Sequence, residues 1–126
     1  MRQPVSILVV DDDPEMRALV QDVLCAEGYK IVEAKDGADA VLALRARAFD
    51  VILMDKNMPG PSGLDLLPGL RRVAPGTQII MMTAFGDVPS YMEAVEKGAV
   101  EFLFKPFPMG EIKAAIAKAV GGAGLH

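Results

Sequence analysis

Residues 7–13 read ILVVDDD, so that four apolar residues run directly into three aspartates. Three further apolar runs, at residues 51–54, 79–82 and 102–104, are each followed by one polar residue, namely Asp55, Thr83 and Lys105. Continuous apolar runs are typical of strands that are covered on both faces of a sheet. Because ligands of open parallel sheets bind at the carboxyl ends of the strands, we expect these polar side chains to line one edge.

The composition is that of one ordinary globular domain. The chain has 126 residues, of which 52% are hydrophobic and 24% charged, and its formal net charge is -4. This acidic balance argues against direct contact with nucleic acid, which usually needs a basic face. No apolar stretch approaches the roughly 20 residues of a membrane helix, and the first residues do not resemble a signal peptide. We therefore expect no membrane contact and a cytoplasmic location.

Helical apolar patterns alternate with the predicted strands. The first helix follows an Asp13 N-cap, ends at Gly28 and contains the single cysteine, Cys25, which we expect to be buried rather than reactive. A second strand is predicted at residues 29–34, and further helices are predicted near residues 40–44, 64–70, 88–97 and 112–120. In the predicted helix near residues 64–70, Pro68 predicts a kink, unless the helix begins late.

These five strand–helix units predict an α/β domain, with a parallel sheet covered by helices on both faces. We assign residues 1–120 to this domain. Residues 121–126 begin with Gly-Gly-Ala-Gly, which predicts either a flexible tail or the start of a linker to a further domain.

The acidic residues at the predicted edge indicate metal and phosphoryl chemistry. Loops that cradle phosphate carry glycines after the first strand, whereas this loop carries three aspartates. Two carboxylates about 4 Å apart repel by roughly 4 kcal/mol at an effective dielectric constant near 20, so Asp11, Asp12 and Asp55 call for a cation. Oxygen ligands of this charge suit Mg²⁺, or Mn²⁺ in its place.

Phosphoryl transfer to an aspartate needs a nucleophile and groups that neutralise the charge of the transferring phosphoryl oxygens. Asp55 is the candidate nucleophile, Lys105 supplies a positive charge and Thr83 supplies a hydroxyl donor. Each residue also has a simpler interpretation. Thr83 alone suits a turn, a lone lysine is usually solvated, and an aspartate after a strand is often a helix cap.

Taken together, these motifs resemble the CheY-like receiver domains of response regulators in bacterial two-component signalling. The resemblance covers residues 5–120 and is carried by residues 7–13, 51–60, 82–84 and 105–107. It implies a doubly wound (βα)5, flavodoxin-like fold with strand order 2-1-3-4-5. It also implies a signalling role rather than an enzyme acting on other substrates, since such a domain catalyses only its own phosphorylation and dephosphorylation.

The resemblance assigns a role to each site residue. Asp55 would accept the phosphoryl group from a phosphohistidine of a sensor histidine kinase, and Thr83 and Lys105 would contact that group. The Mg²⁺ ligands would be the carboxylates of Asp12 and Asp55 and the backbone carbonyl of Asn57, with Asp11 acting mainly through water.

The resemblance also points to residues around this site. Phe102 would be the switch aromatic, although an ordinary core position is the alternative. The Lys105–Pro106 peptide bond would be cis, which costs little before proline. Asn57 and Phe85 would tune hydrolysis, and we expect the bulk of Phe85 to prolong the life of the phosphoryl group.

Phosphorylation of Asp55 would draw Thr83 and Lys105 inward, turn Phe102 inward and change the surface of the fourth helix, fifth strand and fifth helix. The residues around Thr83 resemble receivers of the NtrC and FixJ kind. Such receivers are usually joined to DNA-binding or ATPase domains, which predicts a role in transcription regulation. A single-domain regulator and a phosphorylation-dependent homodimer remain possible outputs.

The phosphoryl donor must come from outside the chain, because the only histidine is His126, which lies outside every motif. Two other functions compete with the receiver interpretation. One is a Mg²⁺-dependent, haloacid-dehalogenase-like phosphatase, which would use an Asp-x-Asp pattern such as that in Asp11 and Asp13. The other is a pseudo-receiver that binds partners without being phosphorylated.

Overall fold

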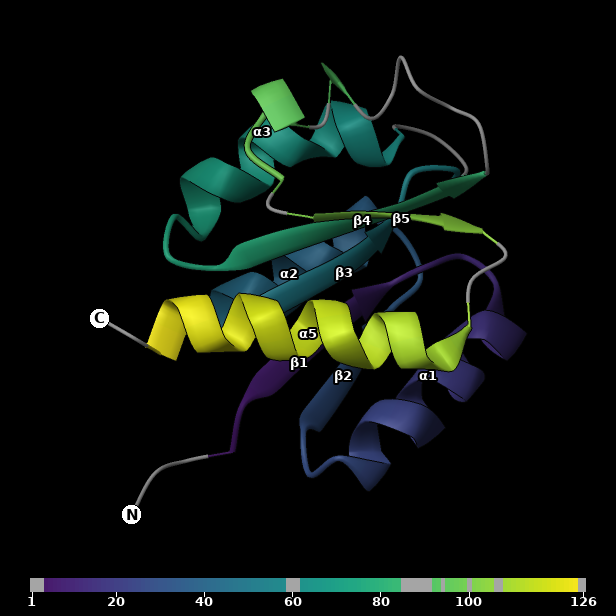
Figure 1. The fold of residues 1–126 in the computed structure, drawn as a ribbon. Helices are drawn as coiled ribbons and strands as arrows, with labels where there is room; N and C mark the ends of the chain where they lie inside the picture. The colour runs from purple at the N-terminus through teal and green to yellow at the C-terminus, as the bar shows by residue number, and fades with distance from the viewer. Residues whose placement is uncertain are drawn as a thin grey trace.

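A computed structural model describes residues 4–58, 62–84, 92–93, 95–99, 101–105 and 108–124. Strands alternate with helices along this part of the chain (Figure 1), as the apolar runs predict. The elements are β1 (Ser6–Val10), α1 (Pro14–Ala26), β2 (Lys30–Ala34), α2 (Gly37–Ala46), β3 (Val51–Asp55), α3 (Gly63–Val73), β4 (Gln78–Ala84), β5 (Glu101–Lys105) and α5 (Met109–Gly124).

The five strands form one parallel sheet in the order β2-β1-β3-β4-β5. The predicted fold class and strand order are thus confirmed. β1 and β3 are neighbours at the centre, with Val10 opposite Met54, so the residues that follow these strands come close together. In the neighbouring pair of strands, β3 and β4, Asp55 lies opposite Met82, which places Thr83 one residue further along β4.

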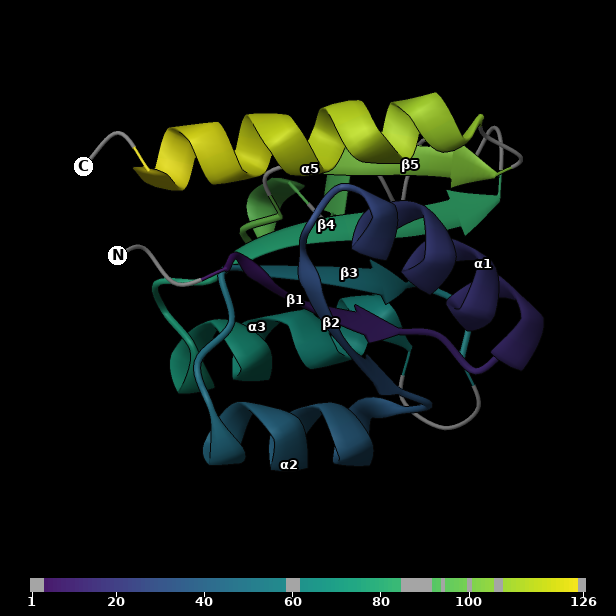
Figure 2. The ribbon, with the colours of Figure 1, turned by 90° about the horizontal axis from the view of Figure 1, so that it is seen from below.

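Helices cover both faces of the sheet (Figure 2), with α1 and α5 on one face and α2 and α3 on the other. Alternate strand residues point to opposite faces, as strand geometry requires. In β1, Ile7 and Val9 pack toward α1 and α5, whereas Leu8 and Val10 pack toward α2 and α3. Because both faces are covered there, the central residues of β1, β3 and β4 are apolar, whereas the edge strand β2 also carries the exposed Lys30 and Glu33.

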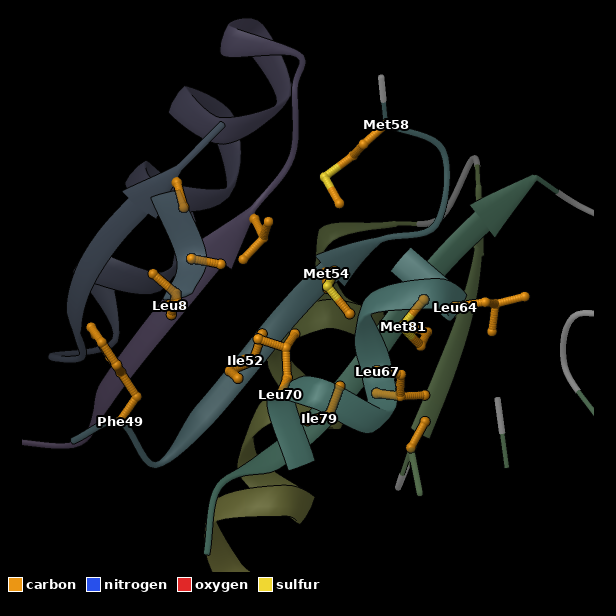
Figure 3. Packing of buried hydrophobic residues seen from close by; sticks show 14 of the residues in the cluster. Leu8, Phe49, Ile52, Met54, Met58, Leu64, Leu67, Leu70, Ile79 and Met81 are labelled. Atoms are coloured by element: carbon orange, nitrogen blue, oxygen red, sulfur yellow. The ribbon is translucent and has the colours of Figure 1, made fainter. Parts of the chain in front are cut away.

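The α3 side of the core is built on leucines spaced three apart. Figure 3 shows Leu67 and Leu70 of α3 directed onto the strand residues Ile52 and Ile79, and all four side chains are at most 1% exposed. Burying a side chain of this size contributes about 1.5–3 kcal/mol. This packing sets the position of α3, whose first residues follow the loop after Asp55.

Helix α1 begins and ends as its sequence predicts. The Asp13 carboxylate accepts a hydrogen bond from the Glu15 N–H at 3.0 Å, which confirms Asp13 as the N-cap. After Ala26 the chain reverses through Gly28, whose φ of 89° is the left-handed conformation that glycine adopts without strain. The N–H groups of Gly28 and Tyr29 close this end on the carbonyls of Cys25 and Leu24.

The expected burial of Cys25 is wrong, because Cys25 is exposed. Only Val20 and Leu24 of α1 are buried, and this pair defines a narrow stripe four residues apart. Leu19 precedes the stripe and Cys25 follows it, and each is turned about 100° away on the helix surface. Leu19 is accordingly 47% exposed.

The helical segments near the carboxyl end differ slightly from expectation. α5 continues through Gly124, whereas we expected the helix to end near Val120. The division of the chain at residue 120 stays a prediction. In the predicted helix at residues 88–97, the described residues 92, 93, 95 and 96 are helical and Lys97 lies in a turn, whereas residues 88–91 and 94 lie outside the described residues. Across the part of the chain that the structure describes, the helices are too short or too polar to cross a bilayer.

Pro68 lies inside α3, which begins at Gly63 and therefore does not start late. A proline has no N–H, so the carbonyl of Leu64, four residues earlier, loses its helical donor. The Lys97 ammonium donates to this carbonyl at 3.4 Å and pairs with Glu93 at 2.6 Å. The freed carbonyl thus ties α3 to the helical segment before β5, which gives Pro68 a structural role.

We expect Lys97→Met to lower the free energy of unfolding by about 1 kcal/mol, the usual net value of a hydrogen bond. The loss should be smaller in a Pro68→Ala background, because the alanine supplies an N–H to the Leu64 carbonyl. Urea unfolding of the four variants of this cycle measures the coupling. Equal losses in both backgrounds would contradict the assignment.

Candidate functional site

Three aspartates gather at the carboxyl edge of the sheet. Asp11 and Asp12 follow β1 and Asp55 ends the neighbouring β3, and one carboxylate oxygen from each lies within 4.8 Å of the others. Asp11 is fully buried and Asp55 is 4% exposed, whereas Asp12 faces solvent. Burial removes the water that would otherwise screen these charges. The cluster is therefore open to solvent on the Asp12 side, and its electrostatic potential is strongly negative.

The loops orient these carboxylates with their own backbone. Asp11 Oδ1 accepts a hydrogen bond from the Asp13 N–H at 2.9 Å, and Asp55 Oδ1 accepts one from the Asn57 N–H at 3.2 Å. Each bond spans two residues and closes a short turn at the end of a strand. The strand ends therefore fix both the position and the direction of the two buried acids.

This arrangement fits a hard divalent cation. The ligand atoms are carboxylate oxygens, which suit Mg²⁺, and the exposed Asp12 leaves room for water and for a phosphate oxygen. Asp11, Asp12 and Asp55 are the residues that would hold such an ion. A bound cation would also remove the repulsion among the three negative charges.

Thr83 and Lys105 come from the two strands beyond β3. Thr83 is fully buried in β4 and lies opposite Phe104, and Lys105 is the last residue of β5, opposite Ala84. The backbone thus brings both residues to the same edge as Asp55. The side chain of Lys105 lies outside the described residues, as do Phe85 and Pro106, so the predicted roles of all three and the cis peptide bond stay predictions.

Phe102 is buried in the core cluster on the α3 side, with 6% of its surface exposed. Its ring centroid lies 5.2 Å from that of Phe104, at an interplanar angle of 48°. The ring therefore already occupies the inward position that we expected phosphorylation to produce. Its packing fits the core-aromatic alternative, and its role as a switch stays a prediction.

The site thus combines clustered acids on two central strands with a hydroxyl on the next. A family model for the response regulator receiver domain matches residues 7–117. The chain belongs to this family. This match confirms the family resemblance that the motifs indicate. Receiver domains are the signalling modules of two-component systems.

Relatives of this receiver domain include transcriptional regulators. The probable transcriptional regulatory protein TcrX of Mycobacterium tuberculosis is 37% identical over 110 residues, which are 87% of this chain and 47% of TcrX. The transcriptional regulatory protein ZraR of Salmonella typhimurium is 33% identical over 120 residues, which are 95% of this chain and 27% of ZraR. The chain thus spans about half or less of these two regulators.

A third relative has almost the same length as this receiver domain. Sporulation initiation phosphotransferase F of Bacillus subtilis is 33% identical over 112 residues, which are 89% of this chain and 90% of that protein. The family therefore includes stand-alone members and members joined to further domains.

Solved structures share the fold of this receiver domain. The chemotaxis protein CheY4 of Vibrio cholerae has a TM-score of 0.87 and 28% identity, covering 93% of this chain and 99% of CheY4. NtrX from Brucella abortus has a TM-score of 0.92 and 29% identity, covering 98% of this chain and 28% of NtrX. The flavodoxin-like arrangement is therefore that of both a chemotaxis regulator and the receiver part of a longer protein.

Sequence reasoning missed two residues that shape the site of this receiver domain. A Cβ atom added to Gly63 would lie 2.6 Å from the Asp55 carbonyl oxygen, so only glycine lets α3 approach the acidic strand end. Arg17 reaches the carbonyl of Asp11 from α1. The Ser62–Asp65 capping box marks the start of α3 and is visible in the sequence, but no sequence signal places Arg17 at the site.

Proposed function

We propose that Asp55 is the phosphoacceptor of this receiver domain and takes a phosphoryl group from a phosphohistidine of a sensor histidine kinase. The observation that carries the proposal is the cluster of Asp11, Asp12 and Asp55 at the edge that also receives Thr83 and Lys105. This combination supports phosphoryl transfer to an aspartate better than any other chemistry of these residues.

The transfer itself needs little from the protein besides position and charge. A carboxylate oxygen of Asp55 attacks phosphorus, the phosphorus–nitrogen bond of the phosphohistidine breaks, and the leaving imidazole nitrogen takes a proton from water. The Asn57 N–H orients the nucleophile through its hydrogen bond to Asp55 Oδ1. When bound, Mg²⁺ would supply positive charge to the phosphoryl oxygens, and its ligands would be Asp12, Asp55 and the Asn57 carbonyl, with Asp11 acting mainly through water.

Thr83 and Lys105 complete the proposed site. The Thr83 hydroxyl would donate to a phosphoryl oxygen and the Lys105 ammonium would neutralise another, which draws the ends of β4 and β5 toward Asp55. Because Phe102 is already inward, the switch would act by changing how often the ring stays inward rather than by moving it once. Phe85 would slow hydrolysis by shielding the phosphoryl group, with Asn57 as the second tuning position.

The output is proposed to be transcriptional, through a DNA-binding or ATPase domain linked after α5 or through a partner protein. β1 begins and α5 ends at the edge of the sheet opposite the aspartates (Figure 1 and Figure 2), so a domain attached there leaves the acidic site open to a kinase. One solved relative is described as a beryllofluoride-activated receiver domain dimer, which supports a phosphorylation-dependent homodimer as a further output. A cytoplasmic location belongs to the same proposal.

Intact mass after incubation with acetyl phosphate and Mg²⁺ tests this function. Wild-type protein should gain one phosphoryl group, and Asp55→Asn protein should gain none, because the carboxamide is not a nucleophile toward phosphorus. Asp22→Asn, at an exposed position on α1, is the matched control and should behave as wild type. Chelation of Mg²⁺ should also abolish the gain.

Other results would point to the competing functions. A phosphoryl group that persists in Asp55→Asn protein would contradict the assigned acceptor. No gain in a folded protein that binds Mg²⁺ would favour the pseudo-receiver. Repeated turnover of a phosphomonoester would favour the haloacid-dehalogenase-like phosphatase, which membership of the receiver family otherwise disfavours.

A further inference from the structure

Arg17 of α1 reaches the acidic site without belonging to the acidic cluster. Its Nη1 donates to the backbone carbonyl of Asp11 at 2.6 Å, and its Nε donates to Glu33 of β2 at 3.0 Å. The Arg17 side chain is only 18% exposed, whereas the Glu33 side chain is 36% exposed, so the arginine is largely covered and the glutamate faces solvent. The guanidinium thus joins α1, β2 and the loop after β1.

The contact fixes the peptide group between the first two aspartates. The Asp11 N–H is held by the Ala34 carbonyl at 3.1 Å, and the Asp11 carbonyl is held by Arg17. That carbonyl belongs to the Asp11–Asp12 peptide, so a rotation of this group would also move Asp12. Asp11 is fully buried, and a buried carbonyl without a donor costs about 1–3 kcal/mol.

We propose that Arg17, oriented by Glu33, is a positioning residue that fixes the Asp11–Asp12 peptide and so aligns the acids for a divalent cation. This proposal rests on the proposed Mg²⁺-dependent function. The planar guanidinium suits the task, because its fork of donors serves the carbonyl and the glutamate at once.

The positive charge of Arg17 and its positioning role predict opposite changes in Mg²⁺ affinity when Arg17 is removed. Arg17 carries a positive charge close to three carboxylates, so its loss should tighten cation binding if charge were its only effect. If Arg17 positions the loop, its loss should weaken binding instead. The sign of the change in affinity therefore separates the two roles.

Isothermal titration with MgCl₂ measures this sign. We expect Arg17→Ala to bind Mg²⁺ about 10-fold more weakly than wild type, the usual effect of removing a partner that orients a metal ligand. Arg17→Lys should recover part of the affinity, because the ammonium can still donate to the Asp11 carbonyl. Arg72→Ala removes the same charge from an exposed position on α3 and should leave the affinity within about twofold.

Thermal unfolding in EDTA reports the purely structural part of the change, since no metal is then bound. If Arg17→Ala does not fold, Arg17→Lys alone carries the test and should still bind more weakly than wild type. Unchanged or tighter Mg²⁺ binding by the folded variant would overturn the positioning role and leave the proposed function intact. A wild-type protein that does not bind Mg²⁺ would overturn both the positioning role and the proposed function. The intact-mass measurement tests the proposed function independently, through phosphorylation of Asp55.

Discussion

In metal-free buffer, Asp55→Asn protein should unfold at a higher temperature than the wild type, and Mg²⁺ should no longer stabilise it. The reason is the spacing of the acids, whose ligand oxygens lie within 4.8 Å of one another. Two charges at this distance repel by about 3 kcal/mol at an effective dielectric constant of 20. The substitution removes the charge of a residue that is only 4% exposed, so water screens it poorly.

The substitution keeps the local hydrogen bond. The amide oxygen of the new side chain can still accept from the Asn57 N–H, which lies 3.2 Å from Asp55 Oδ1. Because the exposed Asp12 is partly screened, we expect a net gain of about 1–2 kcal/mol, or a rise of about 5 °C in unfolding temperature for a domain of this size.

Calorimetry in EDTA and in MgCl₂ checks both halves of this prediction. In MgCl₂ the wild type should gain stability in proportion to the logarithm of ion concentration, because the ion binds only the native state. Asp22→Asn, with the same change of charge at an exposed position, should follow the wild type in both buffers. A metal-free Asp55→Asn protein that is less stable than the wild type would show that the acids do not strain the fold.

In contrast, we expect Gly63→Ala, at the start of α3, to lower the free energy of unfolding. The added Cβ would lie 2.6 Å from the Asp55 carbonyl oxygen and 2.9 Å from Lys56 Cα and from Met81 Cε. Two of these atoms are backbone and cannot rotate away. Gly63 is also anchored there, because its N–H donates to the Lys56 carbonyl at 2.8 Å.

Such overpacking typically costs about 1–3 kcal/mol and displaces the chain around it. Here the displaced chain carries the proposed phosphoacceptor, so the rate of phosphorylation by acetyl phosphate should also fall. Urea unfolding measures the first effect, and the time course of intact mass measures the second.

Gly69→Ala is the matched control, because it lies in the same helix and its added Cβ would meet no atom within 4 Å. It should raise stability by about 0.5–1 kcal/mol, since alanine favours helix over glycine. Gains of equal size at both positions would show that α3 does not rest on the Asp55 loop.

The architecture could be predicted from the sequence because short-range rules set its strands, its helix ends and the residues at the strand ends. The apolar runs of β1, β3 and β4 favour burial on both faces, and each run ends on a residue whose position depends on the strand and not on distant contacts. The Asp13 cap and the Gly28 turn follow from the same short-range rules. The acidic cluster was predictable for this reason, since parallel strands carry their carboxyl ends to one edge.

Other features depend on which surfaces meet in the folded chain, and local sequence patterns do not predict them. Cys25 and Leu19 have helical spacing but fall outside the two-residue stripe that the sheet covers. The Lys97 contact at the Leu64 carbonyl joins residues 33 positions apart, and no local pattern reports it. The same holds for the Gly63 approach to Asp55 and for the reach of Arg17 to Asp11. Local sequence sets which groups a strand end offers, whereas packing between helices and loops decides how firmly those groups are held.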